Sequence, residues 1–166
     1  MTVFLVGFMG SGKTYWGRAW AARTGYRFID LDGEVEAQQG RSISSIFAED
    51  GEESFRDMER AQLHLVAQLA DCIIACGGGT PCYADNMHWM NENGITIYLQ
   101  ASPQQLTERL IPEKFHRPLI KDIDDSNLLF FVEKKLQERE PFYLQAQFVV
   151  PISESNAATI EAILNS

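Results

Sequence analysis

The sequence has few cysteines and no long apolar run. Its three cysteines, Cys72, Cys76 and Cys82, have neither the even number of a disulfide framework nor the spacing of zinc ligands. We therefore expect reduced core thiols and a cytoplasmic protein. No apolar stretch approaches the ~20 residues that a membrane-spanning helix needs, so we expect no membrane association. Because a glycine-rich motif already begins at Gly7, we also expect no signal or transit peptide.

Positive charge is scarce as well. The sequence has 14 lysines and arginines but 23 aspartates and glutamates, which gives a formal net charge of −9. An acidic surface repels nucleic acid and anionic membranes, so we expect neither as a partner. The length of 166 residues predicts a single domain with a sizeable core over residues 1–166, and we expect a monomer. The three histidines have no spacing typical of a metal site or a catalytic triad.

The most informative stretch is the phosphate loop, residues 7–14, which reads Gly-Phe-Met-Gly-Ser-Gly-Lys-Thr. Two glycines around four residues, followed by Lys and Thr, form a phosphate-binding pattern in which backbone N–H groups point at one spot. Lys13 would add positive charge at the outer phosphates, and the Thr14 hydroxyl would bind Mg²⁺. The apolar run 2–6 precedes this loop and helical spacing follows over 14–24, so the positive end of a helix would also face the phosphates.

Strands and helices alternate along the rest of the chain. We expect strands at 26–29, 72–76, 95–99 and 148–150, and helices at 33–39, 43–49, 52–70, 84–93, 104–110, 126–140 and 157–164. Asp50-Gly51 should separate two of these helices, and Pro141 should end another. Residues 111–125 hold two prolines and no clear periodicity, which predicts a mobile loop. The alternation favours a three-layer α/β/α domain around a five-stranded parallel sheet.

Three segments directly follow predicted strands: the phosphate loop, Asp30-Leu31-Asp32 and Gly77-Gly78-Gly79. Ligands bind beyond the carboxyl ends of parallel strands, so we expect the three segments at one edge of the sheet. If the extended geometry persists, the two aspartates point in different directions, one toward a metal and the other toward a second substrate. The three glycines would let a ligand approach the backbone and would leave N–H groups free to bind it.

Three arginines have competing interpretations. Arg56 could merely pair with Glu52 or Glu59 at helical spacing, and Arg139 could merely favour a helix dipole. Arg117 lies in the predicted loop, where it has no helix to stabilise, so the pattern favours a functional role for it.

Taken together, these segments resemble the shikimate kinase family, P-loop kinases of the same superfamily as the nucleoside monophosphate kinases. The matching features run in order along nearly the full chain: 10–14, 17–18, 28–32, 40–43, 46–47, 51–52, 55–56, Glu59, 77–79, 117–119, and Arg139 before 141–143. The resemblance implies phosphorylation of the shikimate 3-hydroxyl by MgATP in aromatic amino-acid synthesis. It also implies a small helical substrate-binding segment around 31–60 and a mobile lid near 111–125.

The resemblance further implies a role for each matching residue. Catalytic roles would fall to Lys13, Asp30, Asp32 and Arg117. ATP would be bound by Gly10, Ser11, Gly12, Lys13, Thr14, Tyr15, Arg109 and Arg117, with Arg109 beside the adenine. Shikimate would contact Asp32, Arg56, Gly77, Gly78, Gly79 and Arg139, the two arginines clamping its carboxylate. Mg²⁺ would be held by Thr14 directly and by Asp30 through water.

Residues 151–156 depart from the family pattern, because they lack the basic residue that some members place near adenine. Backbone groups alone could then hold the base. A gluconate-type kinase on the same architecture is the alternative enzyme, although the contexts Phe55-Arg56 and Arg139-Glu140-Pro141 favour shikimate. A nucleotide-dependent binding protein is the alternative from another class, but 166 residues leave little room for extra interaction surface.

Overall fold

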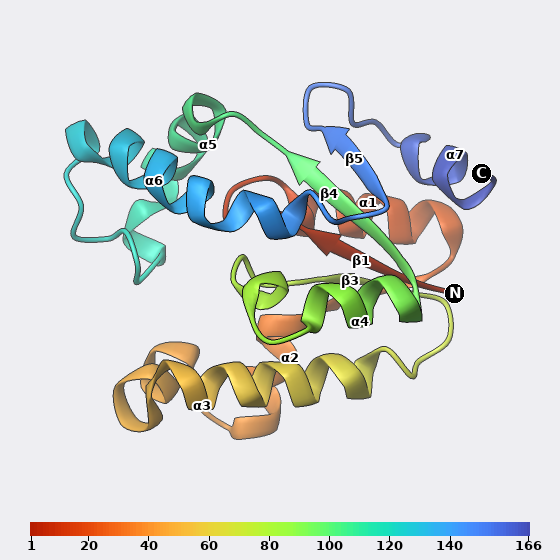
Figure 1. The fold of residues 1–166 in the computed structure, drawn as a ribbon, viewed down its shortest axis with the longest axis horizontal. Helices are drawn as coiled ribbons and strands as arrows, with labels where there is room; N and C mark the ends of the chain where they lie inside the picture. Colours follow the sequence, from red (N-terminus) through yellow and green to blue (C-terminus); the bar gives the residue numbers. More distant parts are fainter.

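A computed structural model describes all residues 1–166, and its five strands form one parallel sheet in the order β2-β3-β1-β4-β5 (Figure 1). The strands are β1 (Thr2–Val6), β2 (Arg27–Asp30), β3 (Cys72–Ala75), β4 (Ile95–Gln100) and β5 (Phe148–Pro151). Every residue of β1 and β3 is buried, as continuous apolar runs require when helices cover both faces of a sheet. The predicted α/β fold with a five-stranded parallel sheet is therefore confirmed.

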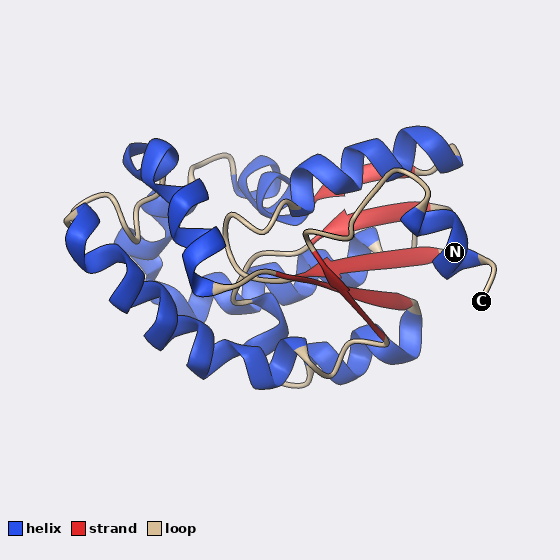
Figure 2. Ribbon diagram, turned by 90° about the horizontal axis from the view of Figure 1, so that it is seen from above, coloured by secondary structure: helices blue, strands red, loops and turns tan.

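The sheet lies between two layers of helices (Figure 2). The seven α-helices are α1 (Lys13–Thr24), α2 (Leu31–Gln39), α3 (Ile43–Val66), α4 (Asn86–Asn93), α5 (Pro103–Leu110), α6 (Asp125–Tyr143) and α7 (Thr159–Leu164). Two short 3-10 turns, η1 (Thr80–Cys82) and η2 (Ile111–His116), follow β3 and α5. None of these helices combines the length and the apolarity needed to cross a membrane. Both chain termini lie at one end of the molecule, away from η2 (Figure 1).

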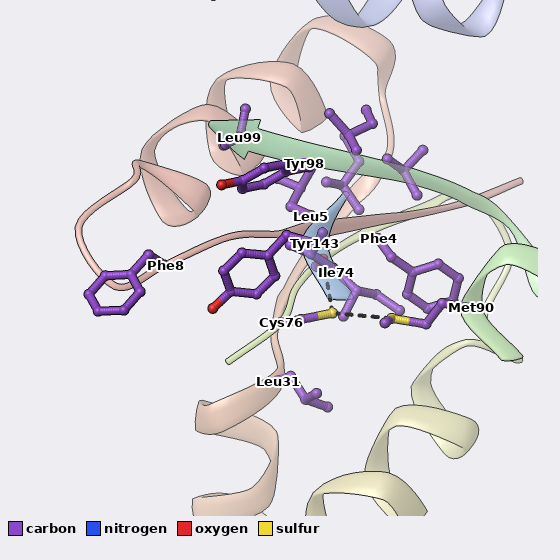
Figure 3. Close-up of a cluster of buried hydrophobic side chains, with 14 of the residues drawn as sticks. Phe4, Leu5, Phe8, Leu31, Ile74, Cys76, Met90, Tyr98, Leu99 and Tyr143 are labelled. Carbon is purple, nitrogen blue, oxygen red and sulfur yellow. Dashed lines mark hydrogen bonds between the residues drawn. The ribbon is translucent and has the colours of Figure 1, made fainter. Parts of the chain in front are cut away.

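The main core surrounds the central strands and includes residues of β1, β3, β4 and α6 (Figure 3). The rings of Tyr98 and Tyr143 lie 5.1 Å apart within it. The Tyr98 hydroxyl donates to Glu140, and the Tyr143 hydroxyl donates to the Gly78 carbonyl at 2.5 Å. Both buried phenols thus have a partner, and the second bond ties the end of α6 to the loop after β3.

A separate small cluster, formed by Val35, Ile46 and Phe55, holds α2 against α3. Within α3 the backbone of Gly51 adopts φ 87° and ψ 170°, so the helix changes direction there. A residue with a side chain rarely adopts this positive φ, which explains why glycine follows Asp50. The predicted break at Asp50-Gly51 is confirmed, and segment 31–60 has its own apolar contacts.

The helix after β2 begins earlier than predicted. Leu31 is its first residue, so Asp32 lies in the first helical turn. Acidic side chains are favourable in that turn because the helix N-terminus carries a partial positive charge. The extended geometry considered for Asp30 and Asp32 therefore does not persist beyond the strand.

The predicted end of the helix near Pro141 is also wrong, because α6 continues through Pro141 to Tyr143. Proline removes only one backbone hydrogen bond in this last turn. Tyr143 is fully buried, and its packing and its bond to Gly78 offset that loss.

Residues 111–125, the lid segment, contain more structure than the sequence predicted. The 3-10 turn η2 occupies its first six residues, and Ile120 is fully buried in the main core. Lys114 donates to the Ile123 carbonyl at 2.8 Å and pairs with Asp125 at 2.6 Å. A single buried residue produces no periodic pattern, which is why the sequence did not reveal this anchor. The mobility of the segment stays a prediction.

Candidate active site

A cleft of about 1240 Å³ opens at the carboxyl ends of β1, β2 and β3. The phosphate loop, Asp30 with Asp32, and the loop after β3 all line it, as the parallel sheet predicted. Arg109 of α5 and Arg117 of the lid segment also line this cleft. Segments far apart in the sequence are therefore brought to one edge of the sheet.

Several backbone N–H groups of the phosphate loop have no hydrogen-bond acceptor within the chain. Gly10 and Gly12 have φ angles of 81° and 96°, which curl the backbone into a concave turn. The N–H groups of residues 9, 10, 12, 13 and 14 donate no hydrogen bond within the chain. Unpartnered amides at a helix N-terminus form an anion site. Ser11 differs from the other predicted ATP contacts: it is buried, and its hydroxyl oxygen has no partner.

Lys13 occupies the floor of the loop. Its ammonium group donates to the carbonyls of Gly7 at 2.7 Å and Phe8 at 2.9 Å. Burial lowers the pKa of Lys13 to about 8, and the negative charge of Asp32 opposes this effect. Bound phosphates would favour the charged form in the same way, so Lys13 is suited to a polyanionic ligand.

Two carboxylates converge at Gly77. A side chain there would lie 3.0 Å from Glu59 Oε2 and 3.1 Å from Asp32 Oδ1, so any larger residue would crowd both groups. Burial raises the pKa of Asp32 to about 6, and the charge of Glu59 raises it further. Burial also raises the pKa of Glu59, which is fully buried. One Glu59 oxygen accepts from Arg56 at 3.0 Å, and the other has no partner.

The two remaining glycines of the triplet accommodate guanidinium groups. A side chain at Gly79 would overlap Arg56, and one at Gly78 would come within 2.9 Å of Arg139. The triplet is therefore needed for the packing of the site itself, a reason that the sequence did not predict. The N–H groups of residues 77–79 donate no hydrogen bond within the chain, as the ligand-binding interpretation requires.

Arg56 and Arg139 differ in their partners. Arg56 pairs with Glu59 at 3.0 Å and with Glu52 at 3.5 Å, so the predicted helical pairing is present. Arg139 is only 8% exposed and makes no ion pair, and its guanidinium lies 5.8 Å from the centre of the Phe8 ring. Both arginines line a second cavity of about 570 Å³ that begins at Gly79. Arg139 is therefore a nearly buried cation with no carboxylate within ion-pair distance, in a cavity that Glu52, Glu53 and Glu138 also line.

The remaining predicted contacts lie around the rim of the cleft. Arg109 donates to the Gly10 carbonyl at 3.4 Å. Arg117 pairs with Glu113 at 2.9 Å, while its buried Nε has no partner. Tyr15 is 70% exposed beside the loop. Thus, of all the predicted site residues, Ser11 alone lines neither cavity.

The chain has no group of three or more His, Cys, Asp or Glu residues suited to a metal. Thr14 and Asp30 nevertheless both face the cleft beside the phosphate loop. Mg²⁺ keeps several waters and takes one or two protein ligands together with substrate phosphates. This sparse set of oxygen ligands therefore fits Mg²⁺ bound with a nucleotide.

Two residues of the site had no role assigned from the sequence. Glu59 positions Arg56, and its spacing of three residues on one helix was the signal available. Tyr143 holds the Gly78 carbonyl, and nothing in the sequence indicated this bond.

Comparison with known proteins identifies the family. The model of the shikimate kinase family matches residues 9–166. A shikimate kinase of Parabacteroides distasonis is 46% identical over 144 residues, which cover 87% of this chain and 83% of that relative. One of Phocaeicola vulgatus is 41% identical over 152 residues, which cover 92% of this chain and 87% of the relative.

Solved structures agree with this match. The crystal structure of shikimate kinase from Bacteroides thetaiotaomicron has a TM-score of 0.94 at 36% identity and covers 100% of this chain and 99% of that one. Shikimate kinase from Acinetobacter baumannii, in complex with shikimate, has a TM-score of 0.87 at 30% identity, with coverages of 99% and 92%. The predicted fold and kinase chemistry therefore have a common explanation: this chain belongs to the shikimate kinase family.

Proposed function

We propose that this chain transfers the γ-phosphoryl group of ATP to the 3-hydroxyl of shikimate, with Arg56 and Arg139 binding the shikimate carboxylate. The observation that carries this proposal is Arg139, a buried cation without an ion pair beside the phosphate-binding cleft. An unpaired buried charge is costly, so the site is suited to an anionic ligand. The A. baumannii relative, solved in complex with shikimate, supports the choice of acid.

The phosphates of ATP bind to the free amides of the phosphate loop and to Lys13. Thr14 and Asp30 would hold Mg²⁺, Asp30 through a water molecule, and the ion would supply charge neutralisation at the phosphates. Arg109 contacts the nucleotide at the rim. Arg117 brings a further positive charge when the lid segment closes over the two substrates, and closure also excludes water.

Asp32 is the acceptor for the shikimate hydroxyl proton. The oxygen of that hydroxyl forms the new bond to phosphorus, the bond from phosphorus to the ADP oxygen breaks, and ADP leaves. The raised pKa of Asp32, about 6, makes it a stronger base than an ordinary aspartate and still leaves it ionised at neutral pH. Asp32 rather than Asp30 has this role because the carboxylate of Asp32 lies at Gly77 beside Glu59, the partner of Arg56.

The proposed active unit is a monomer. All three cysteines are free thiols, which supports a protein that works in a reducing compartment such as the cytoplasm.

The test is ADP release from MgATP with one acceptor at a time: shikimate, gluconate, a nucleoside monophosphate, or none. We expect rapid ADP release with shikimate alone, and a phosphorylated acid as the second product. Faster release with gluconate would overturn the choice of acceptor. Equal ADP release with and without an acceptor would instead indicate an ATPase that does not phosphorylate these compounds.

A further inference from the structure

Residues 151–156 lack the basic residue that some members of the family place near adenine. The nucleobase must therefore find its side-chain contacts elsewhere in the cleft. In the proposed function, the phosphate loop binds the phosphates of ATP, and the acid substrate occupies the side of the cleft that contains Asp32 and Gly77. The rest of the nucleotide must then extend toward the opposite side. There Trp16, Arg109 and Ile152 line the cleft.

Trp16 and Arg109 both lie against Gly12. The indole Cδ1 of Trp16 and Nη1 of Arg109 are each 3.4 Å from the position of a Gly12 side chain. An aromatic ring and a guanidinium plane are thus placed next to the loop that would hold the phosphates. Both groups stack on purine bases, and such contacts need no particular hydrogen-bond pattern.

The indole of Trp16 is held in place from two sides. It stacks on Trp20, with ring centres 5.7 Å apart and planes at 28°, and it meets the edge of Tyr15 at 5.1 Å. Trp20 is fully buried, and its N–H donates to the Asn156 carbonyl at 2.9 Å. The indole N–H of Trp16, in contrast, donates no hydrogen bond within the chain.

These contacts connect α1 to the loop before α7. Trp20 donates to the Asn156 carbonyl and stacks on the Trp16 ring. The position of Trp16 in the cleft wall is therefore coupled to the position of segment 151–156. A ring fixed before binding loses little conformational freedom when a ligand arrives.

We propose that Trp16 is a nucleobase contact that determines the affinity for ATP, with Arg109 flanking the base from the second side. The base is then held by an aromatic side chain of α1 and not by backbone groups of 151–156 alone. This inference rests on the proposed function for the direction in which the nucleotide lies.

The test compares a ligand that has a base with one that has none. MgADP and inorganic tripolyphosphate with Mg²⁺ are titrated by calorimetry into the wild type, Trp16→Leu and Trp16→Phe. Trp89→Leu is the matched control, because Trp89 stacks on His64 away from both cavities. Circular dichroism melting shows that each variant is folded.

We expect Trp16→Leu to weaken MgADP binding roughly tenfold and to leave tripolyphosphate binding unchanged. Trp16→Phe keeps an aromatic ring and should lose less, and Trp89→Leu should bind MgADP as the wild type does. The quenching of tryptophan fluorescence by MgADP should persist in Trp89→Leu and largely disappear in Trp16→Phe.

Two results would overturn the role of Trp16. One is an unchanged affinity of Trp16→Leu for MgADP, and the other is an equal loss for MgADP and tripolyphosphate, which would indicate a distorted phosphate loop. A wild type that binds MgADP as expected but does not phosphorylate shikimate would overturn the proposed function alone. If Trp16→Leu does not fold, the MgADP affinity of Trp16→Phe and the quenching of its tryptophan fluorescence test the role of Trp16.

Discussion

The phosphate-binding side and the acid-binding side of the cleft are built in different ways. The first consists of eight consecutive residues, and backbone amides supply most of its donors. The second combines Asp32, the Arg56–Glu59 pair, the glycine triplet and Arg139, which come from four separate segments. Recognition by backbone can be encoded locally, whereas recognition by side chains depends on how the chain folds.

The two sides also differ in electrostatics. The phosphate loop has one buried ammonium group surrounded by carbonyls and free amides. The acid-binding side packs carboxylates and guanidinium groups against one another. Its charges therefore depend on one another, as the raised pKa values of Asp32 and Glu59 show. We expect substitutions in the loop to have one simple effect and those on the acid-binding side to have several.

The largest effect should come from Lys13→Ala. The variant should fold but lose about three orders of magnitude in turnover, because the outer phosphates lose their main side-chain cation during transfer. Turnover with MgATP and shikimate measures this, with Lys134→Ala on the exposed surface of α6 as the control. Near-normal turnover in Lys13→Ala would remove the phosphate loop from the mechanism.

Arg139→Ala should come next, with shikimate binding weakened by about 2 kcal/mol or more, roughly thirtyfold. Its ATP affinity should stay unchanged, and its melting temperature should fall less than that of Arg56→Ala, because Arg139 has packing contacts but no ion pair to lose. Arg56→Ala should weaken shikimate binding too, but should also destabilise the protein by leaving Glu59 buried without its partner. Calorimetry and thermal melting distinguish the two variants.

Arg23→Ala, which removes an exposed ion pair with Glu161, is the control for both arginines. Normal shikimate binding by both Arg56→Ala and Arg139→Ala would refute the carboxylate clamp and favour the gluconate-type alternative.

Arg117→Ala tests the lid segment, which belongs to neither side. We expect turnover to fall about tenfold or more while shikimate affinity changes little, because this arginine acts on charge in the transition state. Lys121→Ala, exposed on the same segment, should have no effect. A variant that keeps its turnover and loses only shikimate affinity would make Arg117 a ground-state contact.

Hydrogen exchange gives a second measure of the lid segment. Exchange across residues 111–125 should slow when both substrates, or unreactive mimics of them, are bound. The backbone near Ile120 should change least, because its side chain is already buried without ligand. Slow exchange throughout the segment in the free enzyme would contradict a mobile lid.

The smallest effect is a change in pH dependence. Asp32 must be ionised to accept a proton, so kcat/KM for shikimate should fall as the pH drops below about 6. The charge of Glu59 helps to raise the pKa of Asp32, so Glu59→Gln should move this acidic limb to lower pH. Glu161→Gln, which affects an exposed pair with Arg23 away from both cavities, should leave the limb in place. If the acidic limb of the pH profile lies at the same pH in Glu59→Gln as in the wild type, the charge of Glu59 does not act on the proton acceptor Asp32.

By itself, the sequence determined the features of this protein that depend on residues close together along the chain. The phosphate loop needs its glycines, Lys13 and Thr14 within eight positions, and the apolar runs of the strands determine a buried parallel sheet. The sheet in turn predicts that loops after different strands meet at one edge. The break at Gly51 was also visible, since glycine after aspartate disfavours a continuous helix.

Tertiary structure alone decided how side chains from distant segments meet. The convergence of Asp32 and Glu59 on Gly77, the missing counterion of Arg139 and the burial of Ile120 each depend on contacts across the fold. The same holds for Trp20, which reaches Asn156 and thereby positions Trp16. Spacing along the chain cannot report such contacts, because burial and charge pairing arise only after the helices pack on the sheet.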